Sequence, residues 1–193
     1  MSENCIEIQD LSKAFGEQQV LCHLNMDIPL GTCSVLMGPS GKGKTTLLRI
    51  LLGLEQADSG SINNLPEIHS AVFQEDRLCD DFTALDNVAM VMRGRKKRDL
   101  IREHLAAVGL ADASEKPVRL LSGGMRRRVA LVRSILADSD MILLDEPFKG
   151  LDENARRMVI DYFTERTRGK TTLVVTHDPE EAEMLRANML YLQ

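Results

Sequence analysis

Gly38-Pro-Ser-Gly-Lys-Gly-Lys44-Thr45 follows the short apolar segment 33–37 and precedes the apolar-rich segment 45–53. The stretch fits the pattern G-x-x-x-x-G-K-[ST]. Glycines let consecutive backbone N–H groups turn inward around phosphate oxygens, and a helix that follows directs the positive end of its dipole at them. A strand, a glycine-rich loop and a helix in this order predict a phosphate-binding loop.

This loop is expected to bind a nucleotide through many contacts; the alternative is a glycine-rich turn that binds none. One anion at a helix N-terminus gains ~0.3 to 1 kcal/mol when exposed and up to ~2 kcal/mol when partly buried, so binding must draw on several donors. Lys44 would bridge the β- and γ-phosphates, and the Thr45 hydroxyl would ligate Mg²⁺. The expected contact residues are Gly38, Pro39, Ser40, Gly41, Lys42, Gly43, Lys44, Thr45 and Thr46.

Strand and helix patterns alternate on either side of this loop. The apolar segments 33–37, 141–144 and 171–176 have the length and composition of buried strands. Helical patterns cover residues 122–137 and 152–168. Such βα units with apolar strands are typical of a parallel sheet that helices cover on both faces.

The segment before the loop has a different period. Val20, Cys22, Leu24, Met26 and Ile28 alternate with more polar neighbours. This alternation predicts a half-buried strand, because successive side chains of a strand point to opposite faces. We therefore expect these five side chains to share one face.

No strand pattern occurs between Thr83 and Leu121. Two helical patterns occur there instead, at residues 85–92 and 99–108, and Gly109 closes the second. The segment is expected to form a helical lobe inserted into the α/β core; the alternative is two surface helices of one lobe.

Composition restricts the class of protein. The chain has 193 residues, 44% hydrophobic and 27% charged, which is typical of one globular domain. The longest stretch without a charged side chain, residues 28–41, is too short to span a bilayer. The first residues carry no pattern of a secretory signal, so we expect a cytoplasmic protein.

Charge argues against affinity for nucleic acid through bulk positive charge, because the formal net charge is −5. Any basic function must be local, and the one candidate is Arg93-Gly-Arg-Lys-Lys-Arg98. This run is expected to be a solvated turn that leads into a helix; the alternative is contact with acidic lipid headgroups or with a partner.

The cysteines give no metal-binding pattern. Cys5, Cys22, Cys33 and Cys79 show no C-x-x-C spacing, and three of them lie among apolar residues. A reduced thiol in such surroundings behaves as a small hydrophobic group. We expect free thiols and no cysteine-bound metal.

The apolar segment 141–144 ends in two adjacent carboxylates, Asp145 and Glu146. Their side chains would point to opposite sides of a strand and can therefore have different roles. Asp145 suits the ligand shell of Mg²⁺, and Glu146 suits the polarisation of an attacking water. An acidic pair alone is more often a solvated turn, but downstream of a phosphate loop it predicts the second half of a nucleotide site.

A second anion-binding helix start is predicted in Leu121-Ser-Gly-Gly-Met-Arg-Arg-Arg128. Its plainest interpretation is a helix with Ser122 as N-cap, and the two glycines allow an anion to approach the backbone closely. One nucleotide does not easily need two such helix ends from one chain. We therefore expect Ser122, Gly123, Gly124 and Met125 to contact a nucleotide held by a second copy of the chain.

The motifs in this order, with Gln74 after the first and His177 after the last, resemble the ATP-binding subunits of ABC transporters over nearly the whole chain. The resemblance implies an α/β P-loop NTPase core with a mostly parallel sheet, a small antiparallel β region and an inserted helical subdomain. It implies one ABC ATPase domain over residues 1–193, with a RecA-like core at about 1–82 and 122–193 and a helical subdomain at about 83–121. Only sixteen residues follow His177, so we expect no appended C-terminal regulatory domain.

The resemblance also implies roles for individual residues. Phe15 would stack on adenine; the alternative is a core phenylalanine. Gln74 would sense Mg²⁺ and the water and would connect to the membrane partner, and His177 would contact the γ-phosphate. Asp152 would lie in the loop between the two sites of a head-to-tail dimer. The implied catalytic residues are Glu146, His177 and Gln74, and the implied Mg²⁺ ligands are Thr45, Gln74 and Asp145.

Some positions depart from the family pattern. Met125 replaces a glutamine and removes side-chain hydrogen bonds, but Ser122 and the two glycines remain. Lys149-Gly150 replaces Ser-Ala in the loop before Asp152. The segment 53–74 is short, which suggests a trimmed antiparallel β region.

The function implied is ATP hydrolysis that powers solute import, with ATP and Mg²⁺ bound and a homodimer in the ATP-bound state. Segments 73–78, 85–88 and 144–148 are similar to the importers of the nitrate, sulfonate and taurine group. The implied partners are membrane permease subunits and, indirectly, a solute-binding protein, at the cytoplasmic face of the membrane and without nucleic acid. The alternatives are a soluble ABC ATPase that acts on nucleic acid or ribosomes, and a nucleotide-dependent regulatory clamp.

Overall fold

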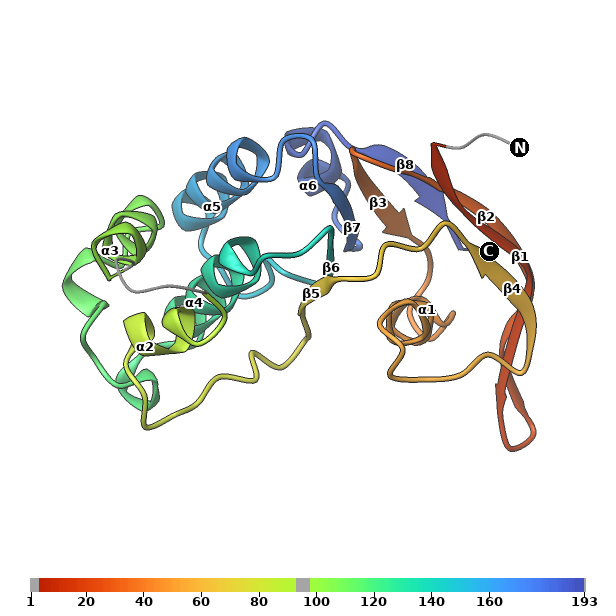
Figure 1. The fold of residues 1–193 in the computed structure, drawn as a ribbon, viewed down its shortest axis with the longest axis horizontal. Coiled ribbons are helices and arrows are strands. Elements are labelled where there is room, and N and C mark those ends of the chain that lie inside the picture. The colour runs from red at the N-terminus through yellow and green to blue at the C-terminus, as the bar shows by residue number, and fades with distance from the viewer. Residues whose placement is uncertain (1–3, 93–97, 193) are drawn as a thin grey trace.

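A five-stranded parallel sheet forms the centre of the computed structural model, which describes residues 4–92 and 98–192 (Figure 1). The strands lie in the order β5-β6-β7-β3-β8, so the chain crosses over between neighbours as a parallel sheet requires. The strands are β3 (Cys33–Met37), β5 (His69–Val72), β6 (Met141–Asp145), β7 (Thr171–Val175) and β8 (Asn188–Tyr191).

Helices cover both faces of this sheet, as the apolar strands predicted. Helix α1 lies on one face, and α5 and α6 lie on the other (Figure 1). The helices are α1 (Lys44–Leu51), α2 (Ala84–Ala89), α3 (Arg98–Ala107), α4 (Gly123–Leu136), α5 (Glu153–Arg166) and α6 (Pro179–Met184), with short 3₁₀ turns η1 (Ala111–Ala113) and η2 (Val118–Leu120). In the described ranges 4–92 and 98–192, no helix is long and apolar enough to cross a bilayer.

Each central strand contributes alternate side chains to two separate cores. Met141 and Leu143 of β6 pack in the core that α1 shares with the N-terminal strands. Ile142 and Leu144 pack in the core that contains α4 and α5. Because both faces of β6 are buried, its sequence is continuously apolar up to Asp145.

A three-stranded antiparallel sheet lies beside α1, in the order β2-β1-β4. Its strands are β1 (Cys5–Phe15), β2 (Gln18–Pro29) and β4 (Ser59–Asn63). The expected strand at residues 20–28 and the expected small antiparallel region are therefore present, but the sequence patterns did not indicate β1, β4, β5 or β8, or helix α6.

The predicted alternation within β2 is wrong at one end. Leu24 and Met26 are partly buried and Ile28 is buried, as expected, but Cys22 is exposed and Leu21 is buried in its place. The pairing with β1 shifts register between Leu24 and Leu21, and His23 has a φ of 47°. The bulge at His23 reverses the faces on which the preceding side chains lie, so Leu21 rather than Cys22 points into the core.

The segment 84–120 contains α2, α3, η1 and η2, and it lies at the end of the molecule opposite the antiparallel sheet (Figure 1). The two expected helices are present with slightly different ends, and Gly109 follows α3 with a φ of 72°. Side chains of α2 and α3 share one continuous core with the parallel sheet. Residues 93–97 of the basic run lie outside the described residues; Arg98 forms ion pairs with Asp86 and Glu115.

Candidate functional site

A cavity of about 340 Å³ opens at the carboxyl end of the parallel sheet, where β3 and β6 end. Ligands bind at this edge of open α/β sheets. The predicted phosphate loop, Gln74 and the Asp145–Glu146 pair all contribute to its walls although they are far apart in sequence. The lining residues are Phe15, Val20, Ser40, Gly41, Gly43, Lys44, Thr45, Thr46, Gln74, Asp145, Glu146 and Val175.

The loop wraps the amino group of Lys44, whose Nζ donates to the carbonyls of Gly38 at 2.6 Å and Pro39 at 2.9 Å. Gly38 and Pro39 therefore hold the lysine rather than line the cavity. Lys42 lines a neighbouring hollow beside β2 instead. Among the residues that the structure describes, Lys44 is the only lysine that lines the cavity, and the loop carbonyls hold its charge at the cavity wall.

The start of α1 is open to an anion. Gly43 is its N-cap with a φ of 89°, and no side chain of the described residues caps the helix. A Cβ at this position would lie 2.8 Å from the carbonyl oxygen of Val20, so only glycine fits without displacing β2. The first N–H groups of α1 thus lack side-chain acceptors, and such groups form an anion site.

Thr45 and Asp145 meet in the cavity, as the two motifs predicted. The Thr45 hydroxyl donates to Oδ2 of Asp145 at 2.7 Å. The other carboxylate oxygen, Oδ1, is buried and has no hydrogen-bond partner among the described residues. Burial raises the pKa of Asp145, and the Thr45 hydrogen bond partly offsets this rise. A hydroxyl beside an unpartnered carboxylate oxygen is a donor set that fits Mg²⁺.

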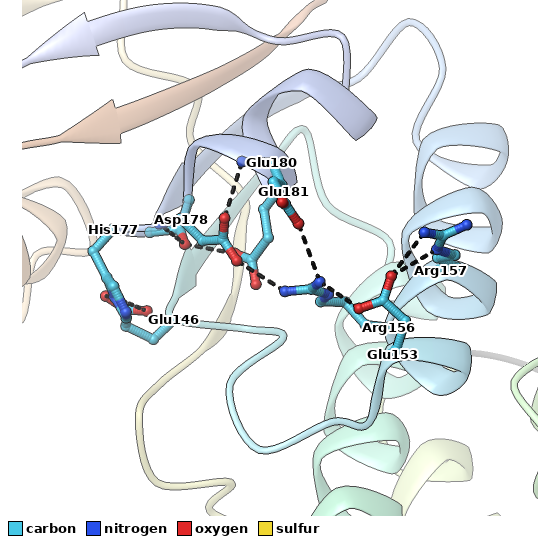
Figure 2. A network of polar contacts seen from close by, with 9 residues as sticks. Glu146, Glu153, Arg156, Arg157, His177, Asp178, Glu180 and Glu181 are labelled. Carbon is cyan, nitrogen blue, oxygen red and sulfur yellow. Dashed lines mark hydrogen bonds and ion pairs between the residues drawn. The ribbon is translucent and has the colours of Figure 1, made fainter.

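Glu146 and His177 form a second pair (Figure 2). Nδ1 of His177 lies 3.0 Å from both carboxylate oxygens of Glu146. The hydrogen bond to Glu146 raises the pKa of His177. Glu146 has a φ of 49°, a conformation that is strained for a non-glycine residue and is typical of functional sites. Its side chain is only 12% exposed, whereas that of His177 is 69% exposed and does not line the cavity.

Phe15 lies at the mouth of the cavity and is 49% exposed. The alternative of a core phenylalanine is therefore excluded. The amino group of Lys13 lies 5.1 Å from the ring centroid and holds one side of the ring. The exposed ring can stack on a planar group.

The sequence patterns did not single out Arg127, which fixes the Gln74 segment to α4. Its guanidinium donates to the backbone carbonyls of Phe73 and Gln74 and forms an ion pair with Asp76 at 3.2 Å. The residue is buried, although charged side chains rarely are unless they are paired. Its position three and four residues before Ala130 and Leu131, on the buried face of α4, is the signal that would have indicated it.

The second predicted anion site lies apart from the cavity, since none of residues 122–125 lines it. Ser122 is the N-cap of α4 and accepts from the Met125 N–H at 3.3 Å. A Cβ on Gly124 would lie 3.4 Å from the Gly150 carbonyl, so this helix start packs against the loop before Asp152. Asp152 itself caps α5 by accepting from the Ala155 N–H at 3.0 Å.

Together, the phosphate loop, the carboxylate pair and the separate glycine-containing helix start define a nucleotide-binding cassette. A family model described as "ABC transporter" matches residues 21–149, two thirds of the chain. The chain belongs to the ABC transporter family.

Among the curated relatives are import subunits. The aliphatic sulfonates import ATP-binding protein SsuB 1 of Paracoccus denitrificans is 38% identical over 97% of this chain and 79% of its own length. SsuB 3 of Rhodococcus jostii is 39% identical over 97% of this chain and 70% of its own length. The sulfate/thiosulfate import ATP-binding protein CysA of Bacillus cereus is 38% identical, but the match covers only 56% of it.

A solved structure has the same fold. The dimeric ATP-binding cassette MJ0796, in a post-hydrolysis state bound to ADP and Pi, matches with a TM-score of 0.83 and 27% identity. The match covers 97% of this chain and 94% of that one. The expected α/β cassette with a small antiparallel sheet is confirmed.

Proposed function

We propose that this chain hydrolyses ATP to power solute import through separate membrane permease subunits, on whose cytoplasmic face it lies. The observation that carries the chemistry is the convergence of Lys44, the open start of α1 and the Asp145–Glu146 pair on one cavity. The import role rests on the relatives, whose names describe import ATP-binding proteins of sulfonate and sulfate transport.

The phosphates of ATP are bound by the loop and the first N–H groups of α1. The amino group of Lys44 exchanges its two carbonyl partners for phosphate oxygens, which form stronger, charge-assisted hydrogen bonds. Donors already fixed around the site need no reorganisation as charge develops on the transferred phosphoryl group.

Mg²⁺ would be held by Thr45, Gln74 and Asp145. The buried, unpartnered Oδ1 of Asp145 and the adjacent Thr45 hydroxyl support this assignment. When bound, the ion neutralises charge on the phosphate oxygens. Arg127 donates a hydrogen bond to the backbone carbonyl of Gln74 and so fixes the backbone from which the Gln74 side chain extends.

Glu146 is the general base that takes a proton from the attacking water. Its low exposure and its strained backbone fix the carboxylate at the cavity wall. His177 contacts this carboxylate through Nδ1 and has an exposed ring. In the proposed mechanism this ring contacts the γ-phosphate. These contacts support the proposal of Glu146 as base beside the phosphate loop and of His177 as the residue that orients it.

Phe15 binds the adenine ring by stacking. We expect Phe15→Ala to weaken ATP binding about tenfold, because base–aromatic stacking contributes ~1 to 3 kcal/mol. Phe15→Trp should retain affinity, since it keeps an aromatic face. Calorimetric titration with ATP measures the loss, and titration with tripolyphosphate, which has no base, is the control. An equal loss for both ligands would contradict the stacking role.

Two copies of the chain enclose each ATP between the phosphate loop of one and residues 122–125 of the other, with Asp152 in the loop between the sites. The separation of these elements within one chain and the dimeric state of the solved relative support this proposal. A shared site predicts that ATP closes the dimer and that blocked hydrolysis traps it. Light scattering should therefore show a doubled mass for Glu146→Gln with ATP and not with ADP. A monomer under both conditions would contradict the proposal.

The permease would contact the helical subdomain, residues 83–121 by our division, beside a core formed by residues 1–82 and 122–193. Exposed apolar side chains in and beside this segment, Phe82, Met90 and Leu120, support the assignment. Purification of the native complex with identification of its subunits tests the import role. An integral-membrane subunit is expected, with a solute-binding protein acting through it. A complex with nucleic acid or ribosomes and no membrane protein would overturn the import role.

A further inference from the structure

Arg156 on α5 lies outside the cavity but is connected to the segment that carries His177 (Figure 2). Its Nη1 lies 2.8 Å from Oδ2 of Asp178, the residue after His177. Its Nη2 lies 2.9 Å from Glu153 and 3.4 Å from Glu180. The guanidinium therefore joins the start of α5 to the start of α6.

The segment Thr176–Asp178 is held on both sides of His177. The Thr176 hydroxyl donates to the buried Glu181 carboxylate at 2.5 Å and accepts from the Asp178 N–H. Oδ1 of Asp178 accepts from the Glu180 N–H and so caps α6. Both neighbours of His177 are thus fixed by side-chain contacts. The histidine ring is exposed, and its only hydrogen bonds to side chains of the described residues are those to Glu146.

We propose that Arg156 is a positioning residue, which holds Asp178 so that Nδ1 of His177 stays on the carboxylate of Glu146. This inference rests on the proposed role of Glu146 and His177 in hydrolysis. Arg156 touches neither the cavity nor the reacting groups, so it acts through Asp178. Because Asp152 caps the same helix α5, the contact also links the loop between the two sites to His177.

Arg157, the next residue, provides a matched control. Its side chain is 67% exposed and pairs with Glu153, whereas that of Arg156 is 18% exposed. Arg157→Gln removes the same charge from the same helix without releasing Asp178. A variant at Arg157 therefore reports what loss of charge and of a helix ion pair does by itself.

The pKa of His177 distinguishes positioning from a through-space effect of charge. Besides Glu146, the charged groups that act on this histidine are Glu181, which raises its pKa, and Lys149, which lowers it. Removal of the Arg156 charge by itself would raise the pKa of His177, since a nearby cation disfavours the protonated ring. Loss of the contact with Glu146 would lower it, because that hydrogen bond is the largest cause of the raised pKa. The two effects have opposite signs.

The test is an NMR titration of the four histidines of the full chain, with the His177 signal assigned by its loss in His177→Ala. Positioning predicts that Arg156→Gln lowers the pKa of His177, that Arg156→Lys restores part of the shift, and that Arg157→Gln leaves it unchanged. An unchanged or raised pKa in Arg156→Gln would overturn the proposal. The titration needs no turnover, so its result does not depend on whether the chain hydrolyses ATP.

A second variant guards against misfolding and adds a kinetic readout. Asp178→Asn releases Arg156 from the other side and keeps an N-cap for α6, because asparagine caps as well as aspartate does. Either variant should lower kcat on the order of tenfold with little change in KM, as expected when reacting groups are misplaced. The double variant should be no worse than the single ones, because each removes the same contact. Additive losses, or a change in KM alone, would contradict the proposal.

Discussion

Replacing Glu146 with glutamine is expected to leave ATP binding intact and to lower the rate of phosphate release ~10² to 10⁴-fold, the usual contribution of a general base. Glutamine has almost the same shape, so the cavity and the contact with His177 can persist. Its amide cannot accept the proton of the attacking water. The loss should therefore fall on kcat.

Two assays measure this outcome. Steady-state phosphate release gives the rate, and calorimetric titration gives the affinity for ATP. Glu165→Gln is a suitable control, because it makes the same change on an exposed part of α5 away from the cavity. Near-normal hydrolysis by Glu146→Gln would remove Glu146 from its role as base.

Lys44→Ala is expected to weaken ATP binding ~10 to 100-fold, because hydrogen bonds to charged groups contribute ~1.5 to 3 kcal/mol each. The variant removes the cation that two loop carbonyls hold at the cavity wall. It also removes the hydrogen bonds that this amino group would donate to the phosphate oxygens. The loss should therefore exceed the effect of charge alone.

Lys42→Ala separates the loss of a positive charge in the loop from the loss of the hydrogen bonds that Lys44 forms at the cavity. It removes the same charge from the same loop, but Lys42 lines the neighbouring hollow rather than the cavity. We expect a clearly smaller loss of affinity for Lys42→Ala in the same titration. Tight ATP binding by Lys44→Ala would count against the phosphate-loop assignment.

Local patterns predicted the elements that form the nucleotide cavity and the separate start of α4. The glycines of the loop, the apolar strand before Asp145 and the capping residue Ser122 each depend on neighbours within a few positions. Strand β6 was predictable from the sequence because burial of both of its faces makes it a continuous apolar run. The meeting of Thr45 with Asp145 follows from the parallel sheet, which brings the ends of β3 and β6 to one edge.

Features set by tertiary contacts were not predictable in this way. The bulge at His23 depends on the pairing of β2 with β1, so the sequence period alone placed Cys22 on the wrong face. Arg156 is one of three arginines in α5, and only its partner in another segment distinguishes it from the exposed Arg157. Strand β8 is short and mostly exposed, so it carries no strong period.

The central claim is that ATP is hydrolysed in sites that two copies of the chain share, and complementation tests it most directly. Lys44→Ala damages the phosphate loop. Gly123→Asp puts a carboxylate at the partner site without disturbing the fold, because a Cβ at Gly123 meets nothing within 4 Å. Each variant alone should be inactive. A mixed dimer of the two would nevertheless contain one site built from undamaged halves.

The decisive measurement is phosphate release by an equimolar mixture of these two variants. Shared sites predict recovery to about a quarter of wild-type activity, since about half of the dimers are mixed and each has one intact site. The control is wild type mixed with the Lys44→Ala/Gly123→Asp double variant, whose mixed dimers have no intact site and should add no activity. A mixture of the two folded single variants that stays inactive would contradict the account.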